Sequence, residues 1–484
     1  MKIIHQYLLL FLSLLLTVAC DDLLEEDPPS NIGSTNFYET EEDALAGLYG
    51  AYNSLYDVYS PDNVINYGEI NADDLTISPI VPDRFEWDNF TYNSEITGGL
   101  WNSAYQGINR ANEVIVNTEA IDFEAGRKAD LIAEAQALRA LYYFALVRAI
   151  GGVPLYETPT TSFDNIYAPR ASEEDVYALV IRDLEAAANE LESESLAGRI
   201  NSGVANAYLA RVHLYLGNYQ EALTHAQNII NSGQYQLLPD YAAVFDPQNN
   251  NSAEHIFQIQ YLSGERNNNL PSRFGPRMPA GGEFTNSFWA GTTIPGLAAP
   301  TDEFIAESPV SYRRSVTIAD QYEHIDGVTG TITMEEIFGG EFPFYISKFD
   351  DRTGELQSGM NLTLFRYADI LLIAAEAMNE VEAGSNQKYD WINQVRTRAR
   401  NGVEENLPNL AGLSQEVFRE AVLEERRFEL AFEGQRAWDL KRRGLFLEAV
   451  RDQEKTVMDF MLLFPVPDDQ VQLNNNLEQN TGWE

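Results

Sequence analysis

Apolar residues recur at intervals of three and four along several long stretches of this chain. The apolar stripe within residues 129–150 consists of Leu131, Ala135, Leu138, Tyr142, Ala145 and Leu146. It stops at a Gly-Gly-Val-Pro segment, residues 151–154, and a second stripe runs through residues 172–192, where Ser172 holds the N-cap place. This period, bounded by a cap and by glycines, predicts two amphipathic helices joined as a hairpin.

The clearest repeat unit lies at residues 207–222, with the sequence AYLARVHLYLGNYQEA. It reads like a tetratricopeptide hairpin, because Leu209-Ala210 take the place of the Leu-Gly pair and Gly217 provides the turn. Further pairs of helical stretches lead us to predict hairpins near residues 129–192, 200–231, 366–400 and 415–449. The predicted fold is therefore mostly α-helical, a tetratricopeptide-like scaffold of about four hairpins.

Two long irregular stretches interrupt this pattern, at residues 60–101 and 235–350. Both are rich in Pro, Gly, Asn, Ser and aromatic residues, and short alternating runs such as residues 255–261 predict a few short strands. Loops of this length inside a compact chain are usually functional. We therefore predict large, mostly irregular insertions on one face of the helical scaffold, and we expect them to bind the ligand.

The first residues have the pattern of a secretory signal. Lys2 precedes the apolar run LLLFLSLLL of residues 8–16, which is followed by TVA and then Cys20. The run is too short to span a bilayer. A small residue before a cysteine is typical of bacterial lipoproteins, so we predict a signal peptide over residues 1–19 and lipidation of Cys20. The alternative is an ordinary signal peptide whose cysteine falls at the cleavage point by chance.

An acidic, proline-containing stretch, DDLLEEDPP, follows the cysteine. Such a composition favours an extended linker, so residues 20–30 are predicted to be a lipidated tether and residues 31–484 a single domain. One acyl chain holds a protein at a membrane only marginally, whereas the two or three chains of a lipoprotein anchor it stably. Membrane lipid is therefore an expected partner.

The charge balance argues strongly against nucleic acid as a partner. The 484 residues include 32 Lys and Arg against 74 Asp and Glu, a formal net charge of −42, which repels phosphate backbones. The single cysteine rules out an intrachain disulfide and a cysteine-based zinc site. We expect no cofactor and no metal site.

The sequence gives little support to a catalytic role. The five histidines form no H-E-x-x-H pair, and no glycine-rich phosphate-binding loop is present. His213 takes a core place of the hairpin motif, so packing is its preferred role. Glycosidase chemistry stays open from the sequence alone, because it depends on the distance in space between two carboxylates.

Segments spread along the chain resemble motifs of the SusD/RagB family of surface glycan-binding lipoproteins. They are EAQALRALYYFALVRAIGGVPL at residues 134–155, RYADILLIAAEA at 366–377, INQVRTRA at 392–399, EERRFELAFEGQRAWDL at 424–440, FPVP at 464–467 and NTGW at 480–483. The chain departs from the family at Asn474-Asn475-Asn476, where Asn-Pro-Asn is expected. It also departs at Thr17, which stands where the lipidation signal usually has leucine.

The resemblance implies a SusD-like fold and a non-enzymatic protein that captures oligosaccharide or peptide for import. It implies a lid on a SusC-like TonB-dependent transporter, in the outer membrane and facing the outside of the cell. In lipoproteins of the Bacteroidetes, which the start of this chain resembles, acidic residues after the cysteine direct export to the surface. Glycan capture is the leading interpretation; the alternatives are a peptide-binding lid, a glycoside hydrolase and a tetratricopeptide adaptor.

Several motif residues are interpreted as structural. The charged residues of the 424–440 segment recur at spacings of three and four, which predicts a lattice of ion pairs between packed helices. Its members are Glu424, Glu425, Arg426, Arg427, Glu429, Glu433 and Arg436. Core packing is predicted for a helical-period set of residues, namely Trp101, Tyr105, Ile108 and Ala111.

A sugar ring presents an apolar C–H face and a belt of hydroxyls, so its receptor needs exposed aromatic rings beside planar polar groups. Both insertions offer such residues, and we predict that Trp87 and Trp289 form stacking platforms. The other predicted ligand contacts are Phe288, Asp74, Arg84, Asn89 and Arg277. A local basic patch of Arg266, Arg273 and Arg277 could meet a sulfate or uronate, or could pair with nearby acids.

Overall fold

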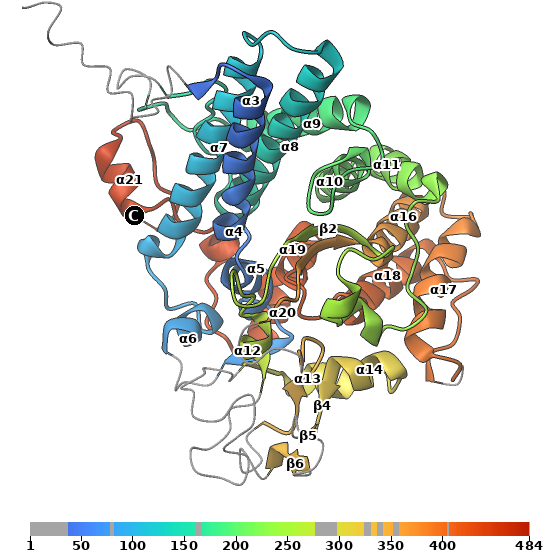
Figure 1. Cartoon of the computed structure of the whole chain (residues 1–484). Coiled ribbons are helices and arrows are strands. Elements are labelled where there is room, and N and C mark those ends of the chain that lie inside the picture. Colours follow the sequence, from blue (N-terminus) through green and yellow to red (C-terminus); the bar gives the residue numbers. More distant parts are fainter. Residues whose placement is uncertain are drawn as a thin grey trace, which may run out of the picture.

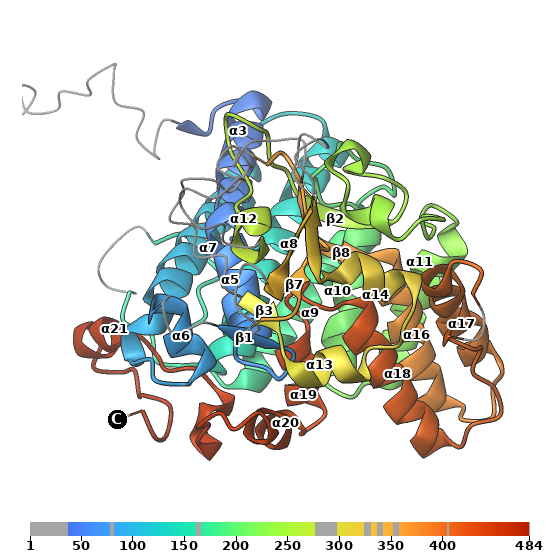
Figure 2. The same ribbon diagram turned by 90° about the horizontal axis from the view of Figure 1, so that it is seen from below.

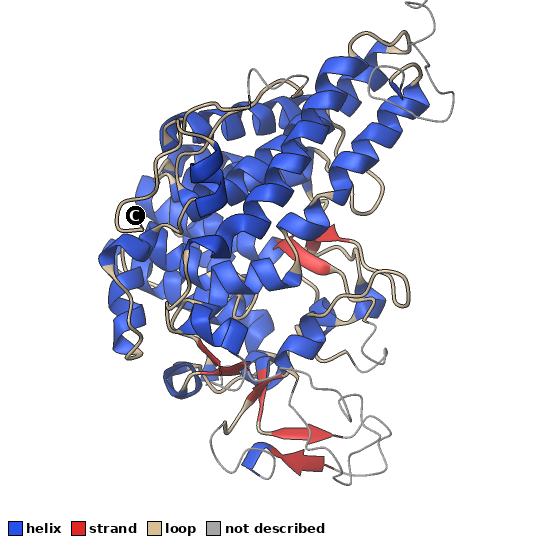
Figure 3. Ribbon diagram, turned by 90° about the vertical axis from the view of Figure 1, so that its left-hand side faces the viewer, coloured by secondary structure: helices blue, strands red, loops and turns tan. Residues whose placement is uncertain are grey.

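Consecutive antiparallel helices build most of the molecule, and the strands are few and short (Figures 1 and 3). The structure, a computed structural model, describes residues 37–77, 82–160, 166–275, 298–323, 331–335, 342–351, 358–403 and 406–483. Within these residues, no helix combines the length and the apolar composition that a membrane span requires.

The helical elements follow one another in this order: α3 (Glu41–Asn53), α4 (Leu55–Val58), α5 (Pro61–Ile65), η1 (Asn66–Ile70), α6 (Pro82–Asp88), η2 (Ser94–Thr97), α7 (Gly98–Thr118), α8 (Ala125–Ile150), α9 (Glu173–Glu190), α10 (Ser202–Tyr215), α11 (Tyr219–Ser232), η4 (Ala242–Phe245), η5 (Pro247–Asn249), α12 (Leu270–Phe274), α13 (Asp302–Glu307), α14 (Tyr312–Thr317), α16 (Tyr367–Val381), α17 (Gln387–Arg400), α18 (Gln415–Glu429), α19 (Arg436–Arg442), α20 (Phe446–Asp452), η7 (Asp459–Leu462) and α21 (Asp468–Leu473). The strands are β1 (Leu75–Ile77), β2 (His255–Ile259), β3 (Ala298–Pro300), β4 (Ile318–Ala319), β5 (Gln321–Glu323), β6 (Thr331–Thr333), β7 (Tyr345–Ile346) and β8 (Leu362–Arg366).

The helices of the predicted hairpins are observed. They are the pairs α8 and α9, α10 and α11, α16 and α17, and α18 followed by the short helices α19 and α20. The Ser172 side chain caps α9 by accepting a hydrogen bond from the backbone NH of Asp175 (3.1 Å). Gly217 has a φ of +73° in the turn between α10 and α11, which a residue with a Cβ adopts only at a cost.

The helices pack in sequence order and form a curved array, in which α11 lies against α16 across the second insertion (Figure 1). Strand β2 lies within that insertion and β8 follows its end, and the two pair antiparallel, with His255 opposite Arg366. All five residues of β2 are buried. The β2–β8 pair therefore forms part of the core between the second and third hairpins. The strand predicted around residues 255–261 is therefore confirmed.

The two insertions meet each other. Strand β1 belongs to the first and β3 to the second, and they pair antiparallel with Leu75 opposite Pro300. Figure 2 shows this pair on the side of the molecule where α13 and α14 also lie. The pairs β4–β7 and β5–β6 lie entirely within the second insertion.

The interior contains a network of charged side chains centred on Glu429, at the end of α18. Its carboxylate accepts hydrogen bonds from Arg313 of α14 (2.9 Å), Arg366 of β8 (2.7 Å) and Arg398 of α17 (2.5 Å). All four side chains are buried. The network thus joins the second insertion to two of the hairpins.

The predicted lattice of ion pairs between packed elements is confirmed. The further pairs are Glu425 with Arg313 and Arg396, Arg426 with Asp369 and Asp439, Arg427 with Asp74, Glu433 with Lys348 and Arg366, and Arg436 with Asp73. The charges face neighbouring elements in the interior instead of one another along a helix. Glu424 forms no ion pair with any residue that the structure describes.

Other core predictions are confirmed. His213 is buried and its ring stacks on His225, with centroids 5.6 Å apart. Trp101, Ile108 and Ala111 are buried, whereas Tyr105 is half-buried. The incomplete burial of Tyr105 marks the edge of a cavity.

Candidate functional site

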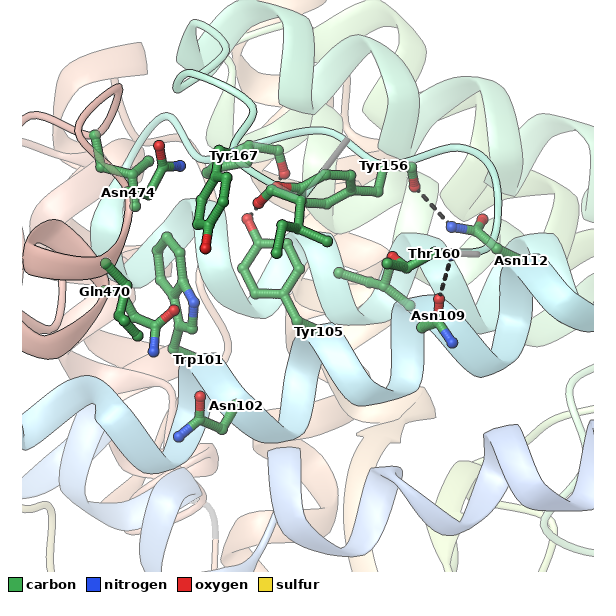
Figure 4. Close-up of a pocket in the computed structure, with 15 residues that line it drawn as sticks. Trp101, Asn102, Tyr105, Asn109, Asn112, Tyr156, Thr160, Tyr167, Gln470 and Asn474 are labelled. Carbon is green, nitrogen blue, oxygen red and sulfur yellow. Dashed lines mark hydrogen bonds between the residues drawn. The ribbon is translucent and has the colours of Figure 1, made fainter. Parts of the chain in front are cut away.

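A cavity of about 320 Å³ lies between α7, residues 154–160 with 166 and 167, and the C-terminal residues 470–477. Its walls carry four aromatic side chains, Trp101, Tyr105, Tyr156 and Tyr167, and five carboxamides, Asn102, Asn109, Asn112, Gln470 and Asn474. Figure 4 shows these side chains around one space, with the Tyr167 ring reaching in from the wall opposite α7. Pockets that hold small ligands have this combination of aromatic walls and a few convergent polar groups.

Helix α7 forms the floor of the cavity. Trp101, Tyr105, Ile108 and Asn112 stand at spacings of three and four and share one face of the helix. The opposite side of α7 is held close to α8 at Gly107, where a Cβ atom would lie 2.6 Å from the Tyr142 ring. The floor is therefore part of the packed scaffold.

The polar side chains of α7 fix the wall above it. The Asn112 amide donates to the carbonyl oxygens of Tyr156 (2.9 Å) and Thr158 (3.2 Å), and Asn109 Oδ1 accepts from the backbone NH of Thr160 (2.8 Å). The Tyr105 hydroxyl donates to the carbonyl of Pro154 (2.8 Å). An irregular segment thereby gains a defined shape, because its backbone groups pair with side chains of a helix.

The C-terminal segment forms the third wall. The Asn474 amide donates to the carbonyl of Ala168 (2.9 Å), and the Asn476 amide donates to the carbonyl of Tyr167 (2.7 Å). These two asparagines hold the backbone at Tyr167 and at the residue that follows it. Tyr167 itself is 47% exposed.

The described part of the cavity lining is electrically neutral. Among the described residues that line it, none has a charged side chain. Burial raises the pKa of Tyr105 well above its usual value, and burial also raises the pKa of Tyr156, so both phenols keep their protons.

Several polar groups of the lining residues are free to bind. The structure gives no hydrogen bond to the Trp101 indole NH, the Asn102 amide or the Tyr167 hydroxyl anywhere in the part of the chain it describes. These groups include donors and acceptors, which matches the hydroxyl belt of a sugar. The described lining residues include no histidine, cysteine or carboxylate, so these residues provide neither a general base nor an anionic metal ligand.

The described residues contain no group of three or more His, Cys, Asp and Glu side chains able to hold a metal ion. A wider groove of about 720 Å³ beside α17 offers less to a ligand. There the Asn393 amide pairs with both backbone groups of Leu410 (2.9 and 2.8 Å), and Arg398 belongs to the Glu429 network.

Comparison with known proteins decides the family. Residues 338–483 match the model of the SusD family, and residues 22–214 match a family described as starch-binding associating with outer membrane. The SusD-like protein P2 of Formosa agariphila is 30% identical over 507 residues, which cover 98% of this chain and 99% of that protein. The chain belongs to the SusD family.

Solved structures of SusD-like proteins share the fold. A SusD homolog from Bacteroides thetaiotaomicron has a TM-score of 0.80 at 23% identity, over 93% of this chain and 98% of that one. A laminarin binding SusD-like protein has a TM-score of 0.76 at 25% identity, over 92% of this chain and all of that one. The predicted SusD-like, mostly α-helical fold is therefore confirmed.

In this SusD-like chain Trp87 is a core residue, and the prediction of an exposed stacking platform there is wrong. The side chain is 5% exposed. Its ring contacts those of Tyr67, Tyr92 and Phe464, with centroids 4.8, 5.5 and 5.6 Å away. The ring is therefore enclosed by protein and cannot stack on a sugar.

Two of the predicted polar contacts are structural as well. Asp74 is buried and accepts from Arg427 Nε (2.7 Å), and burial raises its pKa to about 6. Arg84 is buried and pairs with Asp62 (3.3 Å). Their side chains stabilise the first insertion and are not presented to a ligand.

The remaining predicted ligand contacts stay predictions. Asn89 is half-buried, and its amide donates to the carbonyl of Phe85 (3.1 Å). Arg277, Phe288 and Trp289 lie outside the described residues. Of the basic patch, Arg273 pairs with Asp62 (2.7 Å) and Arg266 lies over the Tyr56 ring, 3.8 Å from its centroid.

Sequence reasoning missed the cavity. Trp101 and Tyr105 were interpreted as core, and they form the floor of the cavity as well. Tyr156 and Tyr167 lie in the irregular stretch between α8 and α9, outside the two insertions that we expected to bind ligand. The one available signal was the asparagine run at 474–476, whose first and third side chains hold the Tyr167 segment.

Proposed function

We propose that this protein is a non-catalytic, surface-exposed glycan-binding lipoprotein of an outer-membrane uptake system. The observation that carries the proposal is the neutral cavity, where aromatic rings stand beside uncommitted amide, hydroxyl and indole groups. Rings of this kind cover the C–H face of a sugar, and the polar groups receive its hydroxyls. The laminarin binding SusD-like protein is a relative whose described ligand is a glycan.

The proposal includes the anchor and the partner. Cys20 carries the lipid after removal of residues 1–19, and residues 20–30 are the tether. The protein faces the outside of the cell and captures oligosaccharide as the lid of a SusC-like TonB-dependent transporter. The family description "associating with outer membrane" supports this location.

We keep Trp289, Phe288, Arg277 and Asn89 as proposed contacts of a longer glycan. They would extend binding from the cavity to the two insertions, Asn89 in the first and the other three in the second, and substitution of Trp289 by alanine tests the second. Retention of full affinity for a long polysaccharide by this variant would remove the insertion from the proposal.

The protein without residues 1–20 is expected to bind at least one polysaccharide of a broad panel and to release no product from it. The expected dissociation constants are millimolar to micromolar, because each stacking contact contributes roughly 1 kcal/mol and ordering costs offset part of it. Affinity electrophoresis measures the binding, and chromatography of the incubated glycan measures any cleavage. Appearance of shortened oligosaccharides, or binding of peptides alone, would contradict the proposal.

Substitution of Cys20 by alanine is expected to move the protein from the membrane fraction to the soluble fraction. The physical reason is the loss of the thiol that receives the diacylglyceryl group, and with it the acyl chains that enter the bilayer. Incorporation of labelled palmitate into the full chain measures this directly. Ser13→Ala, a change inside the same signal, serves as the control and should leave both labelling and fractionation unchanged.

A further inference from the structure

We infer that the cavity selects an uncharged saccharide unit and rejects units that carry uronate, sulfate or phosphate groups. The inference rests on the proposed function and narrows its ligand class. It follows from three observations on the described residues: the lining contains no charge, the nearby guanidinium groups already donate to other protein groups, and acidic side chains adjoin the cavity.

Among the described residues, the two arginines nearest the cavity already donate their hydrogen bonds to other protein groups. Arg139 reaches the lining residue Asn112, but its guanidinium is buried and paired with Asp183 (2.7 Å). Arg170, on the segment that carries Tyr167, donates to the carbonyl oxygens of Gly152 (2.7 Å) and Glu478 (3.0 Å) and to Asn480. An anionic group would enter a partly desolvated space in which these two guanidinium groups already donate to protein oxygens, which is unfavourable.

Acidic side chains adjoin the cavity on two walls. Asp468 and Asp469 begin α21 directly before the lining residue Gln470, and Gln470 donates to Asp469 (3.1 Å). On α7, Glu113 accepts from the lining residue Asn109 (3.0 Å). With a net charge of −42 on the whole chain, these carboxylates repel an anion before it enters.

The ring that closes the cavity is positioned by Asn476. Its amide holds the Tyr167 carbonyl at 2.7 Å, and Figure 4 shows the Tyr167 ring across the cavity from Trp101. Asn476 is exposed and does not line the cavity, so we assign it as a positioning residue. Its neighbour Asn475 is exposed as well, and within the described chain its side chain makes no hydrogen bond.

The test pairs neutral polysaccharides with their sulfated counterparts, for example laminarin with sulfated laminarin and dextran with dextran sulfate, beside alginate and pectin. The protein without residues 1–20 should bind a neutral member at least tenfold more tightly than its sulfated counterpart, at low salt and at 0.15 M salt. Equal or tighter binding of the anionic members would overturn the inference and leave the proposed glycan binding intact. If no glycan binds, the proposed function and the inference both fail.

Variants connect this selectivity to the cavity. Tyr167→Ala should weaken binding of the neutral glycan about tenfold, whereas Tyr49→Ala removes a tyrosine of equal exposure, 48%, from α3 and should not. Asn102→Asp places a charge among the free polar groups and should weaken binding more than Gln106→Glu, which places the same charge one turn along α7 outside the lining. Unchanged affinity in both cavity variants would overturn the inference.

The positioning role of Asn476 has its own readout. Asn476→Ala should weaken binding several-fold, Asn475→Ala should not, and Asn476→Ala should add little in a chain that already carries Tyr167→Ala. This non-additivity is the signature of one residue acting through another. Equal losses from Asn476→Ala with and without Tyr167 would remove the positioning role.

Discussion

Replacing Glu429 with glutamine is expected to lower the free energy of unfolding by about 3 to 5 kcal/mol, since this is the usual cost of breaking a buried ion pair by removing one partner. The Glu429 carboxylate receives hydrogen bonds from Arg313, Arg366 and Arg398, and all of these side chains are buried. Glutamine keeps the shape of the side chain and loses its charge. The three buried guanidinium groups would then lose one of the carboxylates that compensate their charge, which destabilises the folded state.

The same arrangement predicts acid sensitivity. Burial opposes ionisation of Glu429, but the three arginines outweigh it and hold the pKa of this carboxyl far below its usual value of 4.5. In the unfolded chain the group takes up a proton near pH 4.5, whereas in the folded chain it stays ionised to much lower pH. Its stabilisation is therefore complete above pH 4.5 and is lost progressively as the pH falls below that value.

Chemical denaturation of wild type and Glu429→Gln at pH 7 and pH 4 measures both effects. The difference between the two proteins should be largest at pH 7 and smaller at pH 4. Arg182→Gln is the matched control, because it breaks the exposed pair with Glu157 (2.6 Å; side chains 57% and 50% exposed) and should cost less than about 1 kcal/mol. A loss for Glu429→Gln no larger than that of the control would show that the network adds nothing to stability.

The helical scaffold could be predicted from the sequence because its information is local. The stripe through residues 129–150, the Ser172 cap and the Gly217 turn each fix a structure within a few neighbours along the chain. The last hairpin was predicted less well, since α18 ends at Glu429 and two short helices follow. Gly434 sits in that break with a φ of +76°, and a Cβ on it would come within 2.4 Å of Val64. The break therefore reflects contact with a segment far away in the sequence.

The candidate site could not be predicted, because each of its features depends on such distant contacts. Trp87 looked like an exposed loop residue, yet Phe464, hundreds of positions later, covers it. Trp101 and Tyr105 have the spacing of core residues and are largely buried. The cavity beside them exists because residues 154–160 and the C-terminal residues 470–477 pass nearby without filling the space. Tyr167 has no periodic context at all, and its place is fixed by asparagines near the C-terminus. Composition indicated the kinds of side chain a sugar needs and could not indicate which of them would converge.

Substitution of Lys441 by methionine is expected to stabilise the protein by about 2 to 4 kcal/mol at pH 7. The Lys441 ammonium on α19 is buried, and its Nζ atom has no hydrogen-bond partner among the described residues. It lies 5.1, 4.9 and 4.7 Å from the ring centroids of Trp438, Phe446 and Phe464. Attraction to these rings offsets only part of the cost of removing a charge from water. Methionine has a similar length and makes favourable contacts with aromatic rings.

The pH dependence separates this explanation from a simple packing effect. Burial lowers the pKa of Lys441 from 10.5 to about 7, so between these values the unfolded chain binds a proton that the folded chain does not. The cost of Lys441 is complete below pH 7 and is relieved as the pH rises toward 10.5. The stability gained by Lys441→Met, measured by denaturation, should therefore fall to less than half between pH 7 and pH 9.5.

Lys455→Met is the contrasting control. Lys455 pairs with buried Asp88 (2.6 Å) and donates to the carbonyl of Ala72 (2.7 Å), so the same substitution should destabilise the fold. A loss of stability in Lys441→Met, or a gain that does not vary with pH, would contradict the assignment of an uncompensated charge at this position.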